Sequence, residues 1–180
     1  GVKLLAFGTV AGGFLTEKWL NQPEPEMEAL ATWSQMKYKR FIDAAGGWEK
    51  FQYLLKAVHQ VAEKHQVSMA NISSRFMLDQ PAVGGIILGA RLGKSEHIAE
   101  NQKIFDIELD KEDQQLIKNA QAAFDPIPGG CGDEYRKPPF LTASGDLSDH
   151  LEKIPVPFET VDGKDGRKKI FSGTVWEDMA

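Results

Sequence analysis

Two short apolar runs, each closed by a glycine, limit most strongly what this chain can fold into. They are residues 2–7 (VKLLAF), followed by Gly8, and residues 83–88 (VGGIIL), followed by Gly89. Short runs that are apolar without strict alternation are typical of strands covered on both faces of a parallel sheet. Parallel strands need a long connection between them, and the segment between these two runs is long enough for helices. The sequence therefore predicts two buried strands of a parallel sheet.

The segment between the runs carries helical periodicity. From Trp48 onward apolar residues recur at steps of three and four, which predicts an amphipathic helix over 48–64. Ser68 is a suitable N-cap for a second helix, and Pro81 is expected to end it. Residues 26–42 have room for one or two further helices between proline-rich and glycine-rich loops.

Two more helices are expected after the second run. Ser95 is the expected cap of a short helix, and Asp110 begins another with Asp113 as the partner of a capping box. Strands that alternate with helices in this order predict an α/β fold built from βαβ units. Two strands alone cannot complete such a sheet, so we expect further strands upstream of Gly1.

Charge and cysteine content narrow the functional classes. The net charge of −5 argues against a nucleic-acid partner, and no apolar run approaches the length of a membrane span. The single cysteine, Cys131, excludes an internal disulfide framework and a cysteine-based metal cluster. The four histidines lack metal-ligand spacing, so no metal site is expected. We expect a cytoplasmic protein, since sparse cysteine fits a reducing compartment.

The composition changes after Phe124. Residues 125–166 contain six of the nine prolines and no helical period, which predicts an irregular Pro-rich linker or extension. Residues 167–180 then carry a strand-like run that follows a turn rich in Gly and Asp. The expected domains are therefore 1–124, 125–166 and 167–180.

Two glycine-containing turns are candidate phosphate sites. The first spans residues 8–13, after the first run, and the second spans residues 89–95, where Arg91 and Lys94 precede the expected short helix. Backbone N–H groups, basic side chains and a helix N-terminus all favour anions. Neither turn has the spacing of a Rossmann fingerprint or a P-loop. A tight strand-to-loop turn and an exposed basic loop remain the alternatives.

Taken together, the two turns resemble a known family. Residues 4–16 (LLAFGTVAGGFLT) are similar to the seventh barrel strand of aldo-keto reductases and its following loop. Residues 86–91 (IILGAR), followed by 96–101 (EHIAEN), are similar to the eighth strand and its helix. The resemblance covers residues 1–124 and implies the C-terminal part of a (β/α)8 TIM barrel, namely strands 7 and 8 with their helices.

The resemblance also implies a cofactor site. Phe7 matches the position whose ring stacks on the nicotinamide, Arg91 the position at the adenosine 2′-phosphate, and His97 a position often held by a second arginine. The complete set of implied cofactor-binding residues is Phe7, Gly8, Val10, Gly12, Arg91, His97, Glu100 and Asn101. Of these, Gly8, Val10 and Gly12 match the backbone along the pyrophosphate, and Glu100 and Asn101 match contacts to adenine. The implied cofactor is NADP, with NAD as the alternative because of His97.

The implied function is NADP(H)-dependent oxidoreduction, in which hydride passes between the nicotinamide and a small-molecule carbonyl or alcohol. The family's catalytic Tyr, Lys, Asp and His find no match in this chain, so no catalytic residue is assigned. We therefore expect the isolated chain to be inactive and to require the missing N-terminal half of the barrel. A non-catalytic nicotinamide-nucleotide sensor or regulatory module is the alternative function.

A second, shorter resemblance lies at the C-terminus. Residues 167–177 (RKKIFSGTVWE) are similar to the first strand of RidA-type enamine/imine deaminase domains. This similarity implies that residues 167–180 begin such a domain.

Overall fold

The structure is a computed structural model. It describes residues 1–90, 93, 96–129, 160–163, 165–171 and 176–178. The chain divides into two compact units, which are treated separately below. The first unit consists of residues 1–22 and 48–124, and the second consists of residues 23–47 and 125–180.

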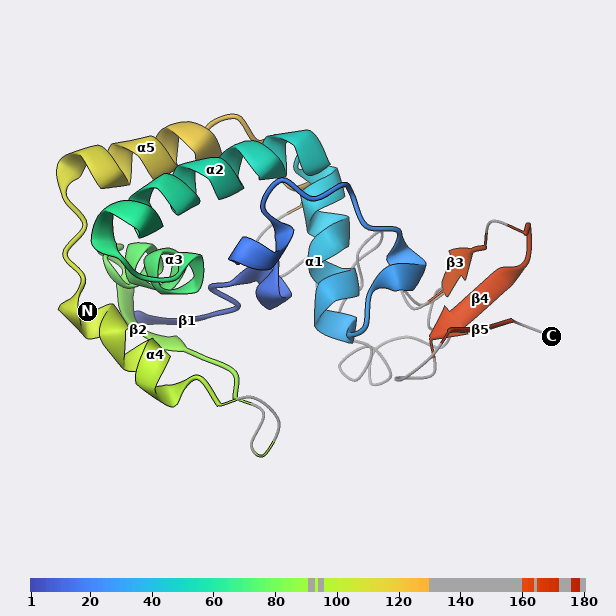
Figure 1. The fold of residues 1–180 in the computed structure, drawn as a ribbon, viewed down its shortest axis with the longest axis horizontal. Coiled ribbons are helices and arrows are strands. Elements are labelled where there is room, and N and C mark those ends of the chain that lie inside the picture. The colour runs from blue at the N-terminus through green and yellow to red at the C-terminus, as the bar shows by residue number, and fades with distance from the viewer. Residues whose placement is uncertain (91–92, 94–95, 130–159, 164, 172–175, 179–180) are drawn as a thin grey trace. The chain divides into compact units, whose positions relative to one another are not determined.

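The first unit contains one sheet of two parallel strands. β1 (Leu4–Phe7) pairs with β2 (Val83–Ile87), and the register places Phe7 opposite Ile87 with an irregularity after Leu4. The two strands are the apolar runs predicted from the sequence, and their parallel pairing is confirmed. Their carboxyl ends therefore lie next to each other at the same edge of the sheet (Figure 1).

The expectation of a partial TIM barrel is wrong. The described residues are mostly helical, and the first unit has a two-stranded sheet in place of barrel strands 7 and 8 with their helices. Burial on both faces is also wrong for β1, because Leu4, Leu5 and Phe7 are 60%, 66% and 57% exposed. A barrel closes only when enough tilted strands pair around an axis, and two strands do not meet that condition.

A layer of three helices forms the core of the first unit. α2 (Trp48–His65) packs against α3 (Met69–Leu78) and against α5 (Lys111–Gln121), as Figure 1 shows. α2 confirms the predicted amphipathic helix, since its apolar stripe is buried along its length. The buried side chains of α2 are Trp48, Phe51, Leu54, Leu55, Ala57, Val58, Val61 and Ala62.

The caps of these helices follow the sequence closely. The Ser68 side chain accepts a hydrogen bond from the backbone N–H of Asn71 at 3.2 Å, which confirms it as the cap of α3. Asp110 and Asp113 form the predicted capping box of α5. The short helix α4 (Ile98–Gln102) begins later than expected, with His97 at its N-cap position, so the expectation of a cap at Ser95 is wrong. A 3₁₀ turn over Lys103–Asp106 continues α4.

Two 3₁₀ turns, Ala11–Gly13 and Glu17–Trp19, follow β1. They carry Phe14 into an aromatic cluster in which its ring lies 4.9 Å from that of Trp19 and 5.9 Å from that of Trp48. Because Phe14 is fully buried, this cluster fixes the far end of the loop that begins at Gly8.

The second unit holds one helix and a small antiparallel sheet. A 3₁₀ turn over Met27–Ala29 precedes α1 (Trp33–Ala44), which confirms a helix in this region. The sheet order is β3 (Thr160–Asp162), β4 (Lys168–Phe171) and β5 (Trp176–Asp178). β3 thus lies in the segment predicted to be irregular, while residues 130–159 of that segment lie outside the described part of the chain. The deaminase resemblance stays a prediction, and its strand-like run contains β4.

A buried lysine organises the helical part of the second unit. Lys39 Nζ lies 2.7 Å from Glu24 Oε1 and 2.6 Å from Asp43 Oδ1, and its side chain is 7% exposed. Burial works against its charge, but the hydrogen bonds to Asp43 and Glu24 outweigh that effect and raise the pKa of Lys39. None of the helices in the described part of the chain has the length and hydropathy that crossing a bilayer requires.

Candidate functional site

The candidate site begins at the carboxyl end of β1. Phe7 is the last residue of the strand and exposes 57% of its surface. Gly8 follows with φ of 69°, in the left-handed region that a side chain rarely adopts. The glycine therefore lets the chain turn sharply at the strand end while leaving the aromatic ring of Phe7 accessible.

The turn after Gly8 bends through a run of left-handed residues. Ala11, Gly12 and Gly13 have φ of 48°, 65° and 94°. Within the turn, Ala11 N–H donates to the carbonyl of Gly8 at 2.8 Å and Gly13 N–H donates to that of Val10 at 2.9 Å. Among the residues that the structure describes, the N–H groups of Val10 and Gly12 have no acceptor. The N–H of Ala11 between them is used within the turn, so the N–H groups of Val10 and Gly12 are the two that could serve an anion.

Two side-chain contacts hold this turn against α3. Thr9 Oγ1 and Ser74 Oγ are 2.9 Å apart and buried, and Glu17 Oε1 accepts a hydrogen bond from the N–H of Met69 at 2.6 Å. The second contact also satisfies one of the unpaired N–H groups at the start of the helix. Sequence reasoning missed these contacts because each joins segments more than fifty positions apart.

The second glycine turn is described only in part. Gly89 has open space where a side chain would start, and Gly93 is exposed with φ of 73°. Arg91 lies outside the described residues, as do Lys94 and Ser95. The placement of Arg91 beside the Gly8 turn therefore stays a prediction.

Three predicted residues lie together on α4. His97 is exposed at the N-cap position, and Asn101 N–H donates to its carbonyl at 2.7 Å. Glu100 lies between them and is partly buried. Its Oε1 accepts a hydrogen bond from Asn71 Nδ2 at 3.0 Å, and its Oε2 pairs with Lys103 Nζ at 2.7 Å.

These partners fix the charge and the orientation of Glu100. The ammonium group of Lys103 contributes most to lowering the pKa of Glu100, with smaller contributions from Ser68 and Asn71. Asn71 is 1% exposed and also donates to the backbone carbonyl of Glu100 at 3.0 Å. Its own Oδ1 is buried and unpaired among the described residues. Asn71 is thus a buried support of Glu100 that the sequence did not reveal.

The structure brings the predicted residues together in two groups. Phe7, Gly8, Val10 and Gly12 form one continuous turn, while His97, Glu100 and Asn101 form one turn of helix. The parallel pairing of β1 with β2 places the two strand ends that lead to these groups side by side (Figure 1). Among the described residues, no group of three or more His, Cys, Asp or Glu side chains is suited to hold a metal ion.

An accessible aromatic ring, a turn of free N–H donors and a polar helix surface define a candidate site for a phosphorylated nucleotide. Residues 1–122 match the family model described as "Aldo/keto reductase family". The chain belongs to the aldo/keto reductase family. Members of that family generally bind nicotinamide cofactors.

The position of this match corrects the sequence-based identification. The matched residues are the N-terminal part of this chain, and the described residues form no barrel, so the identification of residues 1–124 as the C-terminal part of a barrel is wrong.

One curated relative is flagellar radial spoke protein 5 of Chlamydomonas reinhardtii. It is 30% identical over 82 residues, which cover 44% of this chain and 15% of the relative. The chain thus matches less than a fifth of the length of that protein.

Proposed function

We propose that this chain binds NADP(H) through the turn after β1 and the surface of α4. The observation that carries the proposal is the row of left-handed residues from Ala11 to Gly13, which leaves the N–H groups of Val10 and Gly12 without acceptors among the described residues. Membership of a family that generally binds nicotinamide cofactors makes a dinucleotide the natural ligand of this turn.

The pyrophosphate is the group that the turn fits best. Two backbone N–H groups without a protein acceptor can stabilise an anion without any basic side chain. Phe7 stands directly before the turn with more than half of its surface exposed, so its ring can stack on the nicotinamide. When bound, the cofactor supplies a hydride that reduces a carbonyl carbon.

The proposed adenosine contacts come from the segment after β2. In the proposal, Arg91 pairs with the 2′-phosphate, and His97 stands close enough in sequence to assist it when protonated. Asn71 and Lys103 hold Glu100 in one orientation. Its side chain would therefore lose little conformational freedom when the adenosine binds. Asn101 offers an amide from the same helical turn.

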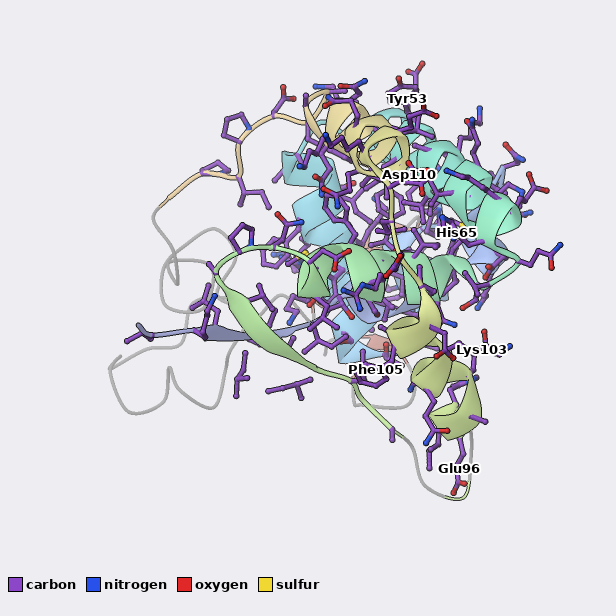
Figure 2. All side chains as sticks on the ribbon, turned by 90° about the vertical axis from the view of Figure 1, so that its left-hand side faces the viewer. Tyr53, His65, Glu96, Lys103, Phe105 and Asp110 are labelled. Atoms are coloured by element: carbon purple, nitrogen blue, oxygen red, sulfur yellow. The ribbon has the colours of Figure 1, made fainter. Side chains whose placement is uncertain are left out.

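We propose further that the isolated chain binds the cofactor without turnover. A reductase needs a proton donor at the carbonyl oxygen, which is a tyrosine in this family. Within the first unit, Tyr53 lies on α2 and is 53% exposed, and Figure 2 shows it at the opposite end from Glu96. Tyr53 is not among the described residues that line the space next to Phe7 and Gly8, where the nicotinamide would lie in this proposal.

Fluorescence titration with NADPH and NADH tests the binding site. Arg91→Ala should weaken NADPH binding about tenfold to a hundredfold, since a charge-assisted hydrogen bond contributes about 1.5–3 kcal/mol, and should leave NADH binding unchanged. Lys118→Ala is the matched control, because Lys118 is exposed on α5. Equal affinities of the native chain and Arg91→Ala for NADPH would contradict the assignment of the 2′-phosphate site.

An NADPH-consumption assay over a panel of aldehydes tests the second proposal. The 180-residue chain should show binding but no consumption above background. Turnover by this chain would show that it supplies its own proton donor.

A non-catalytic role is the second candidate. The relative with a similar segment is named for a flagellar radial spoke and not for a reductase. A chain of this kind would use the nucleotide as a signal and not as a reductant. NADPH binding without turnover in the full-length protein, tested over the same aldehydes, favours this role, whereas turnover there favours the reductase.

A further inference from the structure

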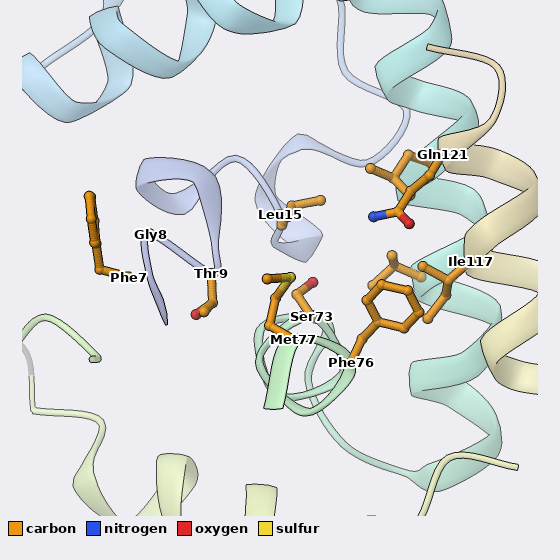
Figure 3. Close-up of a pocket in the computed structure, with 11 residues that line it drawn as sticks. Phe7, Gly8, Thr9, Leu15, Ser73, Phe76, Met77, Ile117 and Gln121 are labelled. Atoms are coloured by element: carbon orange, nitrogen blue, oxygen red, sulfur yellow. The ribbon is translucent and has the colours of Figure 1, made fainter. Parts of the chain in front are cut away.

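A pocket of about 190 Å³ lies between the start of the Gly8 turn and the helical layer (Figure 3). Its walls come from the turn, α2, α3 and α5, all within the first unit. Eleven residues line it: Phe7, Gly8, Thr9, Leu15, Leu54, Val58, Ser73, Phe76, Met77, Ile117 and Gln121.

The lining is apolar, with polar groups at a few fixed points. None of the lining residues is charged. Thr9 and Ser73 are more than nine-tenths buried, while Gln121 is exposed, and its amide end faces the pocket in Figure 3. A site of this composition favours uncharged ligands, because an ion would lose its hydration without gaining a partner.

The buried hydroxyls have unused hydrogen-bonding capacity. Thr9 Oγ1 and Ser74 Oγ share one hydrogen bond, yet each hydroxyl carries a hydrogen, so one O–H of the pair has no acceptor among the described residues. Ser73 Oγ donates to the carbonyl of Met69 at 2.9 Å and keeps its lone pairs as acceptors. A ligand hydroxyl could therefore donate to Ser73 Oγ, and it could accept from Thr9 when Ser74 is the donor in the Thr9–Ser74 bond.

We propose that the pocket binds a small, uncharged, mostly apolar molecule with one hydroxyl group, of the phenol class. Cavities of about 150 Å³ that are lined by apolar side chains stay dry and accept benzene, so this pocket suits about six to ten non-hydrogen atoms. The hydroxyl meets Thr9 and Ser73, and the ring meets Val58, Phe76 and Ile117.

This pocket adjoins the proposed cofactor site and shares Phe7 and Gly8 with it, but it extends beyond them between the helices. Phe7 contributes to one end of the lining, but its ring points away from Ser73 and Met77 (Figure 3). A nicotinamide stacked on that ring would leave the space between the helices unfilled. The proposal does not depend on cofactor binding.

Calorimetric titration of the 180-residue chain with phenol, benzene and benzoate tests the ligand class. Phenol should bind with a dissociation constant of about 0.1–1 mM, and benzene should bind more weakly, as expected for ligands of this size. Benzoate should not bind, because its charge would be buried unpaired. Tight benzoate binding, or no binding of phenol up to 10-fold above the expected range, would overturn the proposal.

Variants locate the binding site. Thr9→Val should weaken phenol binding about three- to tenfold and change benzene binding less than twofold, since only the hydroxyl is lost. Leu15→Trp should fill the pocket and abolish binding of both probes, whereas Leu20→Trp, outside the lining, should preserve it. Circular dichroism verifies that each variant is folded. Binding that persists in both Thr9→Val and Leu15→Trp would place the probes elsewhere.

Two further measurements test whether the probes bind in this pocket and whether the pocket is part of the cofactor site. Ile117→Ala should enlarge the pocket so that indole binds, whereas Leu116→Ala on the same helix, outside the lining, should not. Saturating NADPH should leave phenol binding in place. Displacement of phenol by NADPH would make the pocket part of the cofactor site, and equal indole binding in the two alanine variants would contradict the assigned cavity.

Discussion

The helical layer and the two-stranded sheet of the first unit both carry large apolar side chains but differ greatly in how far these are buried. Leu55 and Ile72, on α2 and α3, are fully buried, whereas Leu4 and Leu5 on β1 are 60% and 66% exposed. The three helices cover one another, while the two strands pack mainly on each other, and β2 also packs against α3. An apolar run thus shows that a segment can be buried, and its neighbours decide whether it is. The stability of this unit should reside in the helices.

The largest expected effect on stability comes from a substitution in the buried helical layer. Leu55→Ala should destabilise the chain by about 2–5 kcal/mol, because it removes buried methyl groups and leaves a cavity. Leu4→Ala is the matched change on β1 and should cost less than about 1 kcal/mol, since most of that side chain is already in water. Urea unfolding measures both. Equal losses would show that the sheet contributes as much as the helical layer.

The next effect tests the polar contact that joins α2 to α5. Asp113 has a side chain 4% exposed, and its carboxylate oxygens lie 2.7 Å from Lys64 Nζ and 2.7 Å from His65 Nε2. Asp113→Asn should cost about 1–3 kcal/mol, because it weakens both contacts and the capping box. Asp106→Asn, at an exposed position, is the control. Urea unfolding at pH 7 measures both variants. Equal stability of the two would contradict the role of Asp113 in joining α2 to α5.

The same contact predicts a loss of stability in acid. The hydrogen bond from Lys64 contributes most to lowering the pKa of Asp110, to about 2. For Asp113, burial raises the pKa, but Lys64 and His65 outweigh it and the pKa is lowered. Carboxyl groups with a lowered folded pKa stabilise the fold above their unfolded pKa, near 3.8, and lose this contribution as the pH falls toward 2.

Unfolding measured between pH 6 and pH 2 checks that acid response. The native chain should lose more stability over this interval than the double variant Asp110→Asn/Asp113→Asn, which has no carboxyl groups left to protonate at these positions. Parallel curves for the two proteins would assign the acid sensitivity to other groups.

Local patterns in the sequence identified most helices and both strands of the first unit. Helix periodicity located α2, and side-chain chemistry located the caps at Ser68 and Asp110, because those signals lie within a few residues of each other. No local pattern predicts a barrel. The barrel was implied by the family resemblance alone, because the exposure of strands and the closure of a barrel depend on contacts between distant segments.

In the candidate site, too, some residues could be predicted from the sequence and others could not. The family resemblance implied Gly8 and Gly12 as site positions, and the structure gives both a left-handed backbone, which favours glycine. The contacts that position the site, such as Thr9 with Ser74 and Asn71 with Glu100, join residues far apart in sequence and have no local signature.

Two neighbouring glycines of β2 test how tightly the two strands pack on each other. A Cβ at Gly84 would lie 2.8 Å from Lys3 Cβ, which belongs to the start of that side chain and cannot easily move. A Cβ at Gly85 would lie 3.2 Å from Leu5 Cδ2, the flexible end of an exposed side chain. Gly84→Ala should therefore cost about 1–2 kcal/mol, and Gly85→Ala less.

Hydrogen exchange of the β1 amides shows whether each of these two variants weakens the sheet locally or destabilises the whole unit. Gly84→Ala should speed exchange at β1 while the amides of α2 keep their protection, because the strands open locally. Equal exchange in Gly84→Ala and Gly85→Ala would show that the strand pairing tolerates either methyl group.

The smallest expected effect on stability comes from the exposed side of β1. Leu5→Lys should change the free energy of unfolding by less than about 0.5 kcal/mol, since the lysine remains in water. It should nevertheless lower the fluorescence of the apolar dye ANS, because Leu5 lies in a strand whose other large apolar residues are exposed as well. Tyr53→Lys, at a 53% exposed position on α2, is the control and should leave dye binding unchanged. If Leu5→Lys instead destabilised the chain by several kcal/mol, β1 would be buried in solution, and the contrast between helices and sheet would disappear.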